Sequence, residues 1–212
     1  MEKNRETYTK GLKRYLDLVL CFEGLTFFWW VYPLCAVAIK IDDPEGPVLF
    51  KQDRIGQHGK VFKMLKFRSM KNNSEHTGTG AYSEKGDPRV TRVGRFLRAS
   101  SLDEVPQIFN IIRGDMSLIG PRSPLTYHPW PWEEYTEEQR KMFNVKPGIT
   151  GWAQVHGRKT VEWHKRIEMN VWYAEHVSLP LDLKIALMTV YKIFSNADNE
   201  NVGKTLRMDS NQ

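Results

Sequence analysis

The chain has 212 residues, of which 41% are hydrophobic, so it can build a packed core within one domain and is not a disordered chain. Its formal net charge of +6 indicates an anionic partner, such as nucleic acid, a lipid surface or a phosphorylated small molecule. Two cysteines exclude a disulfide framework, and a mean hydropathy of −0.51 excludes a polytopic membrane protein.

The first predicted element is an apolar segment at residues 15–39. As one helix of about 25 residues it would be about 38 Å long, enough for a hydrocarbon core of roughly 30 Å. Pro33 interrupts this segment, and Glu23 places a charge in its first half. Both flanks are basic, with five positive and two negative residues among the first 14 and Lys40 beyond the far end. We therefore expect a helix that enters one leaflet, bends at Pro33 and returns, with a buried core helix or a single span as alternatives.

The elements that follow alternate between short strands, loops and helices. After a polar linker, β-rich runs at residues 48–51 and 60–67 predict a hairpin with a glycine-containing turn. A polar, glycine-bearing stretch at 72–88 predicts a mobile loop, and residues 101–113 predict a helix that Gly114 ends. Further predictions are an irregular segment at 119–131, a helix at 133–144, a turn at 146–152, amphipathic helices at 161–177 and 181–194, and a polar tail from 196.

The basic excess is concentrated in residues 51–122, which hold fourteen Lys and Arg against seven Asp and Glu. Two interpretations stay open: a surface that faces solvent or lipid headgroups, and a site for phosphate groups, which need several fixed cationic donors. We expect no nucleic acid partner, because the chain has no helix-turn-helix, zinc-finger or RNP-type signature.

Asp103 and Glu104 are adjacent carboxylates at a predicted helix start. They do not suit glycoside hydrolysis, whose two acids flank a sugar at about 5–9.5 Å. They suit phosphate chemistry, because carboxylates bind Mg²⁺ and a carboxylate can attack phosphorus. Nearby Lys66, Arg98 and Arg122 could stabilise the phosphate oxygens. The alternative interpretation is structural, since Ser101 and Glu104 have the spacing of a capping box and acidic residues are favoured in the first turn of a helix.

Four segments carry a resemblance to a known family. They are residues 66–70 (KFRSM), 92–122 (RVGRFLRASSLDEVPQIFNIIRGDMSLIGPR), 146–158 (KPGITGWAQVHGR) and 171–185 (VWYAEHVSLPLDLKI). From residue 13 to about residue 194, the sequence resembles the bacterial sugar transferases. These are the monotopic phosphoglycosyl transferases that initiate surface-glycan and glycoprotein-glycan synthesis.

This resemblance implies an α+β fold: a mainly helical monotopic membrane protein with an N-terminal re-entrant helix broken at a proline, a small β-hairpin and amphipathic interfacial helices. We expect an N-terminal tail and membrane helix at residues 1–40, a cytoplasmic catalytic domain at 41–195 and a polar tail at 196–212. The expected location is the bacterial cytoplasmic (inner) membrane, with the catalytic domain on the cytoplasmic face. The oligomeric state stays open, with a homo-oligomer as one alternative.

The resemblance also implies transfer of a sugar 1-phosphate from a UDP-sugar to polyprenyl (undecaprenyl) phosphate, with release of UMP and with Mg²⁺ as cofactor. Asp103 would be the nucleophile that forms a phosphosugar-aspartate, and Glu104 would bind the metal together with it. The loop at residues 146–158 is the candidate for the sugar pocket. We expect the re-entrant turn at Pro33. We expect substrate-binding roles for six further side chains: Lys66, Arg68, Arg98, Arg122, Gln154 and Arg158.

The chain departs from the family pattern at a few positions. Tyr32 stands where a serine usually precedes the breaking proline, Glu23 is unusual in a membrane helix, and Asn170 replaces a common acid. The Gly-Pro-Arg motif at residues 120–122 is followed by Ser123 before the next proline. Two alternative functions remain: a membrane-attached basic protein that binds nucleic acid or a protein partner without catalysis, and a membrane nucleotide-sugar diphosphatase that needs no lipid acceptor.

Overall fold

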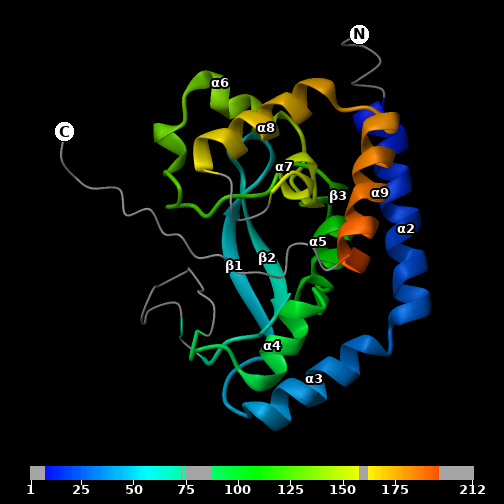
Figure 1. The fold of residues 1–212 in the computed structure, drawn as a ribbon, viewed down its shortest axis with the longest axis vertical. Coiled ribbons are helices and arrows are strands. Elements are labelled where there is room, and N and C mark those ends of the chain that lie inside the picture. Colours follow the sequence, from blue (N-terminus) through cyan, green and yellow to red (C-terminus); the bar gives the residue numbers. More distant parts are fainter. Residues whose placement is uncertain (1–7, 73, 75–86, 158–161, 196–212) are drawn as a thin grey trace, which may run out of the picture.

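The computed structural model describes residues 8–72, 74, 87–157 and 162–195. This part of the chain is mainly helical and contains two small two-stranded sheets, in agreement with the predicted α+β class (Figure 1). The expected tail at 196–212 and most of the expected loop at 72–88 lie outside the described residues.

The N-terminal apolar segment forms two helices at an angle. After a short π-helical turn, Tyr8–Leu12, come α2 (Lys13–Phe28) and α3 (Val31–Asp42), which meet at a bend of 63°. The predicted bend is therefore present, but it lies just before Pro33, which sits in the first turn of α3. A proline fits there because the N–H groups of a first turn have no partner inside the helix.

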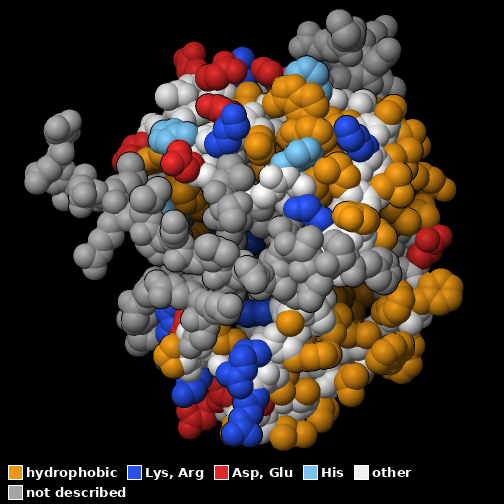
Figure 2. All heavy atoms as spheres, viewed as in Figure 1, with side chains coloured by type: hydrophobic (Ala, Val, Ile, Leu, Met, Phe, Trp, Pro, Cys, Tyr) orange, Lys and Arg blue, Asp and Glu red, His pale blue; other side chains and the backbone are white. Residues whose placement is uncertain are grey.

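Within the described residues, no helix is by itself long and apolar enough for a membrane span, whereas α2 and α3 together meet that length and composition. Neither helix is fully buried, which argues against the alternative of a core helix. Figure 2 shows hydrophobic side chains gathered over the flank that α2, α3 and α9 (Leu179–Ser195) form. The exposed ones on α3 and α9 are Leu34, Val37, Ile41, Leu183, Leu187, Val190, Tyr191 and Ile193.

The predicted hairpin is confirmed. Strands β1 (Leu49–Ile55) and β2 (Val61–Phe67) pair antiparallel. The first strand is longer than predicted. Its last residue, Ile55, is only 1% exposed and packs in an apolar cluster with Phe143 and Val171. The hairpin therefore reaches into the core and carries Lys66 near the end of its second strand.

The predicted helix at 101–113 is wrong in its first half. A single 3₁₀ turn, Leu102–Glu104, precedes α5 (Gln107–Arg113), which Gly114 ends as predicted. The chain cannot continue as one helix because Pro106 has no N–H to donate. Ser101 adopts a left-handed φ of 59° and its side chain makes no cap bond, so the capping box does not form.

The second half of the chain contains more breaks than predicted. Residues 133–144 form 3₁₀ turns around the short α6 (Glu137–Arg140) instead of one helix. Residues 146–152 include a strand, β4 (Gly148–Thr150), which pairs parallel with β3 (Ser117–Ile119). A Cβ at Gly148 would lie 2.1 Å from the backbone nitrogen of Gly120, so only glycine permits this close approach.

The two predicted C-terminal helices are confirmed as α8 (Trp163–His176) and α9, while α7 (Trp152–Val155) is a single turn between β4 and α8. Figure 1 shows α9 lying along α2. A buried carboxylate joins them: Asp182 accepts hydrogen bonds from Lys13, Tyr8 and Tyr173. The apolar N-terminal helix is therefore tied into the rest of the fold by charge as well as by packing.

Candidate active site

The 3₁₀ turn Leu102–Glu104 carries both candidate carboxylates, and we call it the dyad turn. It packs against β2 and directly precedes α5 in the chain, and the fully buried Asn110 of α5 fixes α5 to β2. The Asn110 side chain accepts a hydrogen bond from the Leu65 N–H at 2.9 Å and donates one to the Lys63 carbonyl at 2.8 Å. It therefore replaces a neighbouring strand at the edge of β2 and holds α5 beside the strand that carries Lys66.

Lys66 faces both carboxylates but reaches one of them more closely. Its Nζ lies 2.7 Å from Glu104 Oε1 and 3.9 Å from Asp103 Oδ2, while Arg122 Nη2 lies 3.8 Å from Glu104 Oε1. The side chains of Asp103, Glu104 and Lys66 are 13%, 19% and 16% exposed. Glu104 takes the short ion pair, so within the described part of the chain the nearest cation to the Asp103 carboxylate, Lys66 Nζ, stays 3.9 Å away. This leaves the carboxylate able to approach a substrate.

The electrostatics of Asp103 combine opposing effects. Burial raises the pKa of its carboxyl group above the ordinary value, and the charge of Glu104 raises it further. Lys66 opposes these two effects most strongly and lowers the pKa, with smaller contributions from Arg98 and Arg122. The cations therefore favour the ionised form of Asp103, while burial and Glu104 favour the protonated form and leave its pKa above the ordinary value.

Arg98 is brought to this site by a close helix contact. It lies on α4 (Arg92–Ala99), where a Cβ at Gly94 would come within 1.9 Å of the Ser69 carbonyl oxygen. Because α4 packs directly on that backbone, Arg98 Nε can donate a hydrogen bond to Ser69 Oγ at 2.8 Å. Three of the cations that we expect to bind substrate, Lys66, Arg98 and Arg122, thus also lower the pKa of Asp103.

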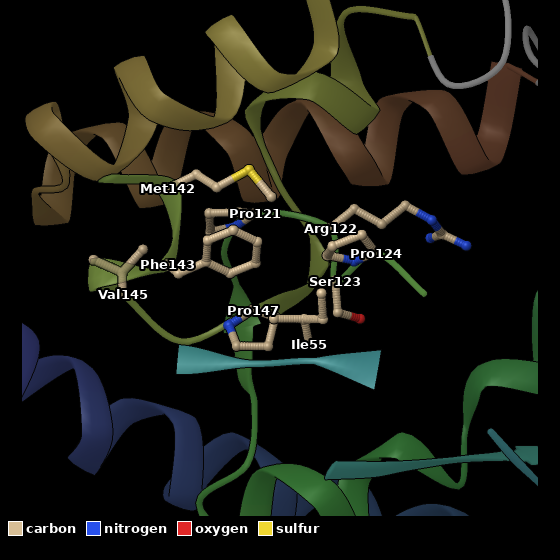
Figure 3. A pocket seen from close by; sticks show the side chains of 9 residues that line it. All are labelled: Ile55, Pro121, Arg122, Ser123, Pro124, Met142, Phe143, Val145 and Pro147. Carbon is tan, nitrogen blue, oxygen red and sulfur yellow. The ribbon is translucent and has the colours of Figure 1, made fainter. Parts of the chain in front are cut away.

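The Arg122 side chain extends from a chain segment whose neighbouring residues pack tightly against the core. Figure 3 shows its side chain pointing away from the other residues around a small pocket. The pocket has a volume of about 10 Å³, which is about the size of one water site, so it is a packing gap and not a substrate cavity. Prolines and apolar side chains surround it: Ile55, Pro121, Pro124, Met142, Phe143, Val145 and Pro147.

The structure does not place all the predicted substrate-binding residues with the dyad. The buried Arg68 side chain donates hydrogen bonds to Asp43 Oδ2, at 2.9 Å, and to the carbonyls of Asp43 and Glu45, so it holds the linker after α3. Gln154 is buried in α7, and neither polar atom of its side chain has a hydrogen-bond partner within the described chain. Arg158 lies outside the described residues.

The donor set fits Mg²⁺ only as part of a substrate complex. Among the described residues, no group of three or more His, Cys, Asp and Glu side chains is arranged to hold a metal ion. Asp103 and Glu104 supply carboxylate oxygens, and Mg²⁺ in phosphate-transfer sites is held by one or two carboxylates together with substrate phosphates and water. The residues present therefore suit a cation that a diphosphate helps to bind.

Some residues shape this site without carrying its charge and were not predicted from the sequence. Asn110 and Ser69 were not assigned any role, although Asn110 stands as a polar residue inside the apolar run of α5 and signals a buried hydrogen bond. Tyr32 was noted only as a departure from the family pattern. Its hydroxyl donates a hydrogen bond to the Val105 carbonyl at 3.2 Å, directly beside the dyad turn.

The fold and the site together define a class: a small α+β protein in which a partly buried carboxylate pair lies near three cations and next to the bend of an apolar helix pair. The chain belongs to the bacterial sugar transferase family, whose model matches residues 8–196. This confirms the resemblance seen in the sequence, and the chain is a transferase.

Relatives with assigned names support this class. An uncharacterized sugar transferase of Bacillus subtilis, EpsL, is 42% identical over 187 residues, which cover 86% of this chain and 87% of the relative. A UDP-glucose:undecaprenyl-phosphate glucose-1-phosphate transferase of Xanthomonas campestris is 40% identical over 90% of this chain and 40% of its own length. A UDP-N-acetylgalactosamine-undecaprenyl-phosphate N-acetylgalactosaminephosphotransferase of Aeromonas hydrophila is 38% identical over 87% of this chain and 44% of its own. The chain therefore spans less than half the length of these last two relatives.

Proposed function

We propose that this protein transfers a sugar 1-phosphate from a UDP-sugar to polyprenyl phosphate, with Asp103 as the nucleophile. The main support is the arrangement at the dyad turn, where Glu104 takes the 2.7 Å contact with Lys66 and Asp103 stays 3.9 Å from it. A carboxylate whose ionised form is favoured by neighbouring cations, but which is not tightly bound to them, suits attack on phosphorus. Relatives named as sugar-phosphate transferases to undecaprenyl phosphate support the substrate classes.

In the first step, an Asp103 oxygen forms a bond to the β-phosphorus of the UDP-sugar. The bond between that phosphorus and the oxygen bridging to the α-phosphate breaks, and UMP leaves with the bridging oxygen. The product on the protein is a phosphosugar ester of Asp103. Lys66, Arg98 and Arg122 would stabilise the negative charge that the phosphoryl oxygens carry during this exchange.

In the second step, a phosphate oxygen of the polyprenyl phosphate attacks the same phosphorus. The bond to the Asp103 oxygen breaks, the carboxylate is restored, and a polyprenyl diphosphate sugar is released. Two separate steps allow one small site to serve a water-soluble donor and a lipid acceptor in turn. Mg²⁺, held by Asp103 and Glu104 when bound, would neutralise diphosphate charge.

The apolar helix pair supports a place for this chemistry at a bilayer. We propose that α2 and α3 enter one leaflet of the bacterial cytoplasmic membrane from the cytoplasmic side, bend at Trp29 and Trp30, and return. The exposed hydrophobic face of α9 would lie at the same surface. This arrangement would hold the dyad turn near the lipid phosphate and make the reaction a first step of surface-glycan synthesis.

The assay that tests the proposal follows UMP release by detergent-solubilised protein given UDP-sugars, Mg²⁺ and polyprenyl phosphate. We expect release that depends on the lipid acceptor for multiple turnovers, and we expect Asp103→Asn to abolish it. Continued turnover without acceptor would indicate a diphosphatase instead. Near-normal turnover by Asp103→Asn would remove this residue as the nucleophile.

A further inference from the structure

The bend of the apolar helix pair touches the dyad turn directly. Tyr32, in the first turn of α3, donates a hydrogen bond from its hydroxyl to the Val105 carbonyl at 3.2 Å. Val105 follows Glu104 in the chain, and its own N–H bonds to the Leu102 carbonyl at 3.2 Å, which closes the dyad turn. The tyrosine therefore binds the residue at which this turn ends.

The ring of Tyr32 packs next to the strand that carries Lys66, the partner of Glu104 in the ion pair described above. Its centroid lies 5.8 Å from that of Phe67 and 5.5 Å from that of Phe109. Phe67 follows Lys66 on β2, just as Val105 follows Glu104 in the dyad turn. Tyr32 thus contacts the immediate chain neighbours of both partners in the 2.7 Å pair between Lys66 and Glu104.

The dyad turn depends on such support because its backbone is not a regular helix start. Ser101 adopts φ 59°, a left-handed conformation that is unfavourable for residues with a side chain, and its hydroxyl makes no cap bond. Its own hydrogen bonds are two backbone contacts, from the Glu104 N–H to the Ser101 carbonyl and from the Val105 N–H to the Leu102 carbonyl, each 3.2 Å long. Contacts from neighbouring elements decide where its carboxylates lie.

We infer that Tyr32 is a positioning residue for the proposed reaction: from the bend of the helix pair, it holds the dyad turn against the strand that carries Lys66. This inference rests on the proposed function. It makes α3 a structural part of the active site as well as a membrane element, and it gives a role to a residue at which this chain departs from the family pattern.

The test compares Tyr32→Phe, which removes only the hydroxyl, with Tyr15→Phe. Tyr15 is a matched control on α2, because its side chain is 65% exposed and lies outside the site. The net contribution of one neutral hydrogen bond corresponds to roughly 3- to 10-fold in rate. We therefore expect Tyr32→Phe to lower kcat for UMP release by about that factor, with KM for the UDP-sugar within about twofold. Tyr15→Phe should match the unmodified protein in both constants.

Hydrogen–deuterium exchange gives a readout that does not depend on activity. In Tyr32→Phe, we expect faster exchange confined to the peptide that covers residues 101–106, with Tm close to that of the control. Tyr32→Ser, which also removes the ring, should increase both effects. Unchanged kcat and unchanged exchange in Tyr32→Phe would overturn the inference, as would a loss of activity that only follows a general loss of folded protein. If the unmodified protein released no UMP, the proposed function would fail, whereas local exchange would still report whether Tyr32 holds the turn.

Discussion

At the scale of single residues, the site depends on one lysine, Lys66, which attracts two carboxylates at different distances. Lys66 is the strongest influence that lowers the pKa of Asp103, against burial, which raises it. Because only the ionised carboxylate can attack phosphorus, the rate of UMP release should fall as the pH drops through the pKa of this group. The pH at which the rate falls, the acid limb of the pH profile, therefore reports how strongly the Lys66 charge lowers the pKa of Asp103.

Lys66→Met should move the acid limb of UMP release to higher pH. Without the lysine charge the pKa of Asp103 rises, so at any given pH a smaller fraction of the carboxylate is ionised. Lys66→Arg keeps a positive charge and should leave the limb close to that of the unmodified protein. The measurement is the pH profile of single-turnover UMP release. An acid limb that stays in place in Lys66→Met would contradict this electrostatic role.

Two arginines that the sequence assigned to the same role should behave differently. Arg122 is 41% exposed and lies 3.8 Å from Glu104, so Arg122→Ala should lower turnover at least tenfold while it changes the free energy of unfolding by about 0.5 kcal/mol or less. Arg68 is buried and bonded to the linker, so Arg68→Ala should destabilise the fold by about 2–4 kcal/mol. Thermal unfolding measured beside UMP release tests both. An Arg122 variant whose activity falls only because it unfolds would make this residue structural.

The motifs indicated charged residues as candidates for the site, but they did not predict where each side chain points. Lys66, Asp103 and Arg122 were expected together, and the fold brings them together. Arg68 belongs to the same short motif as Lys66, yet it lies near the end of the hairpin where its side chain turns toward the linker. Sequence spacing alone does not distinguish these two orientations, because they depend on long-range packing.

At the scale of secondary-structure elements, the apolar periodicity predicted those strands and helices that are determined by the local sequence. The hairpin, α8 and α9 follow the apolar spacing, and α8 buries Ile167 and Val171 on one face, as expected for an amphipathic helix. The helix over 101–113 was wrong because Pro106 overrides its pattern. Strand β4 was missed because it has only three residues, begins with a glycine and so carries no clear strand pattern. Its partner β3 also lies about 30 residues earlier in the chain, so local sequence does not reveal the pairing.

The buried carboxylate between α2 and α9 should be important for stability. Asp182→Ala leaves Lys13 buried without its partner, and we expect a loss of about 3–5 kcal/mol in the free energy of unfolding. Adding Lys13→Met should recover part of that loss, because the unpaired charge is then removed as well. Unfolding of both variants and the double variant in detergent gives the coupling energy. Additive effects would show that the two side chains do not stabilise each other.

At the scale of the whole molecule, the main question is how the bent helix pair meets a bilayer. Composition predicted an apolar segment, and the structure shows its bend and its exposed hydrophobic face. A re-entrant pair places both of its flanks on the same side of the membrane, whereas a single span places them on opposite sides. The two arrangements therefore differ in which flank is accessible from the cytoplasm.

Cysteines introduced on the two flanks test this directly. Gly11→Cys lies before α2, in open space, and Lys51→Cys lies on an exposed position of β1. We expect a membrane-impermeant thiol reagent to label both in inside-out vesicles and neither in intact spheroplasts. The unmodified chain, whose Cys21 and Cys35 are buried, gives the baseline. Labelling of Gly11→Cys only from the outer side would indicate a span.

The covalent step is the most direct test of the whole account. The protein is incubated with a UDP-sugar and Mg²⁺ in the absence of lipid acceptor, quenched in acid, digested and analysed by mass spectrometry. We predict that the peptide containing Asp103 gains the mass of the sugar phosphate, and that this adduct disappears when polyprenyl phosphate is added before the quench. Formation of the lipid-linked product by a protein that never carries the adduct at Asp103 would contradict the account.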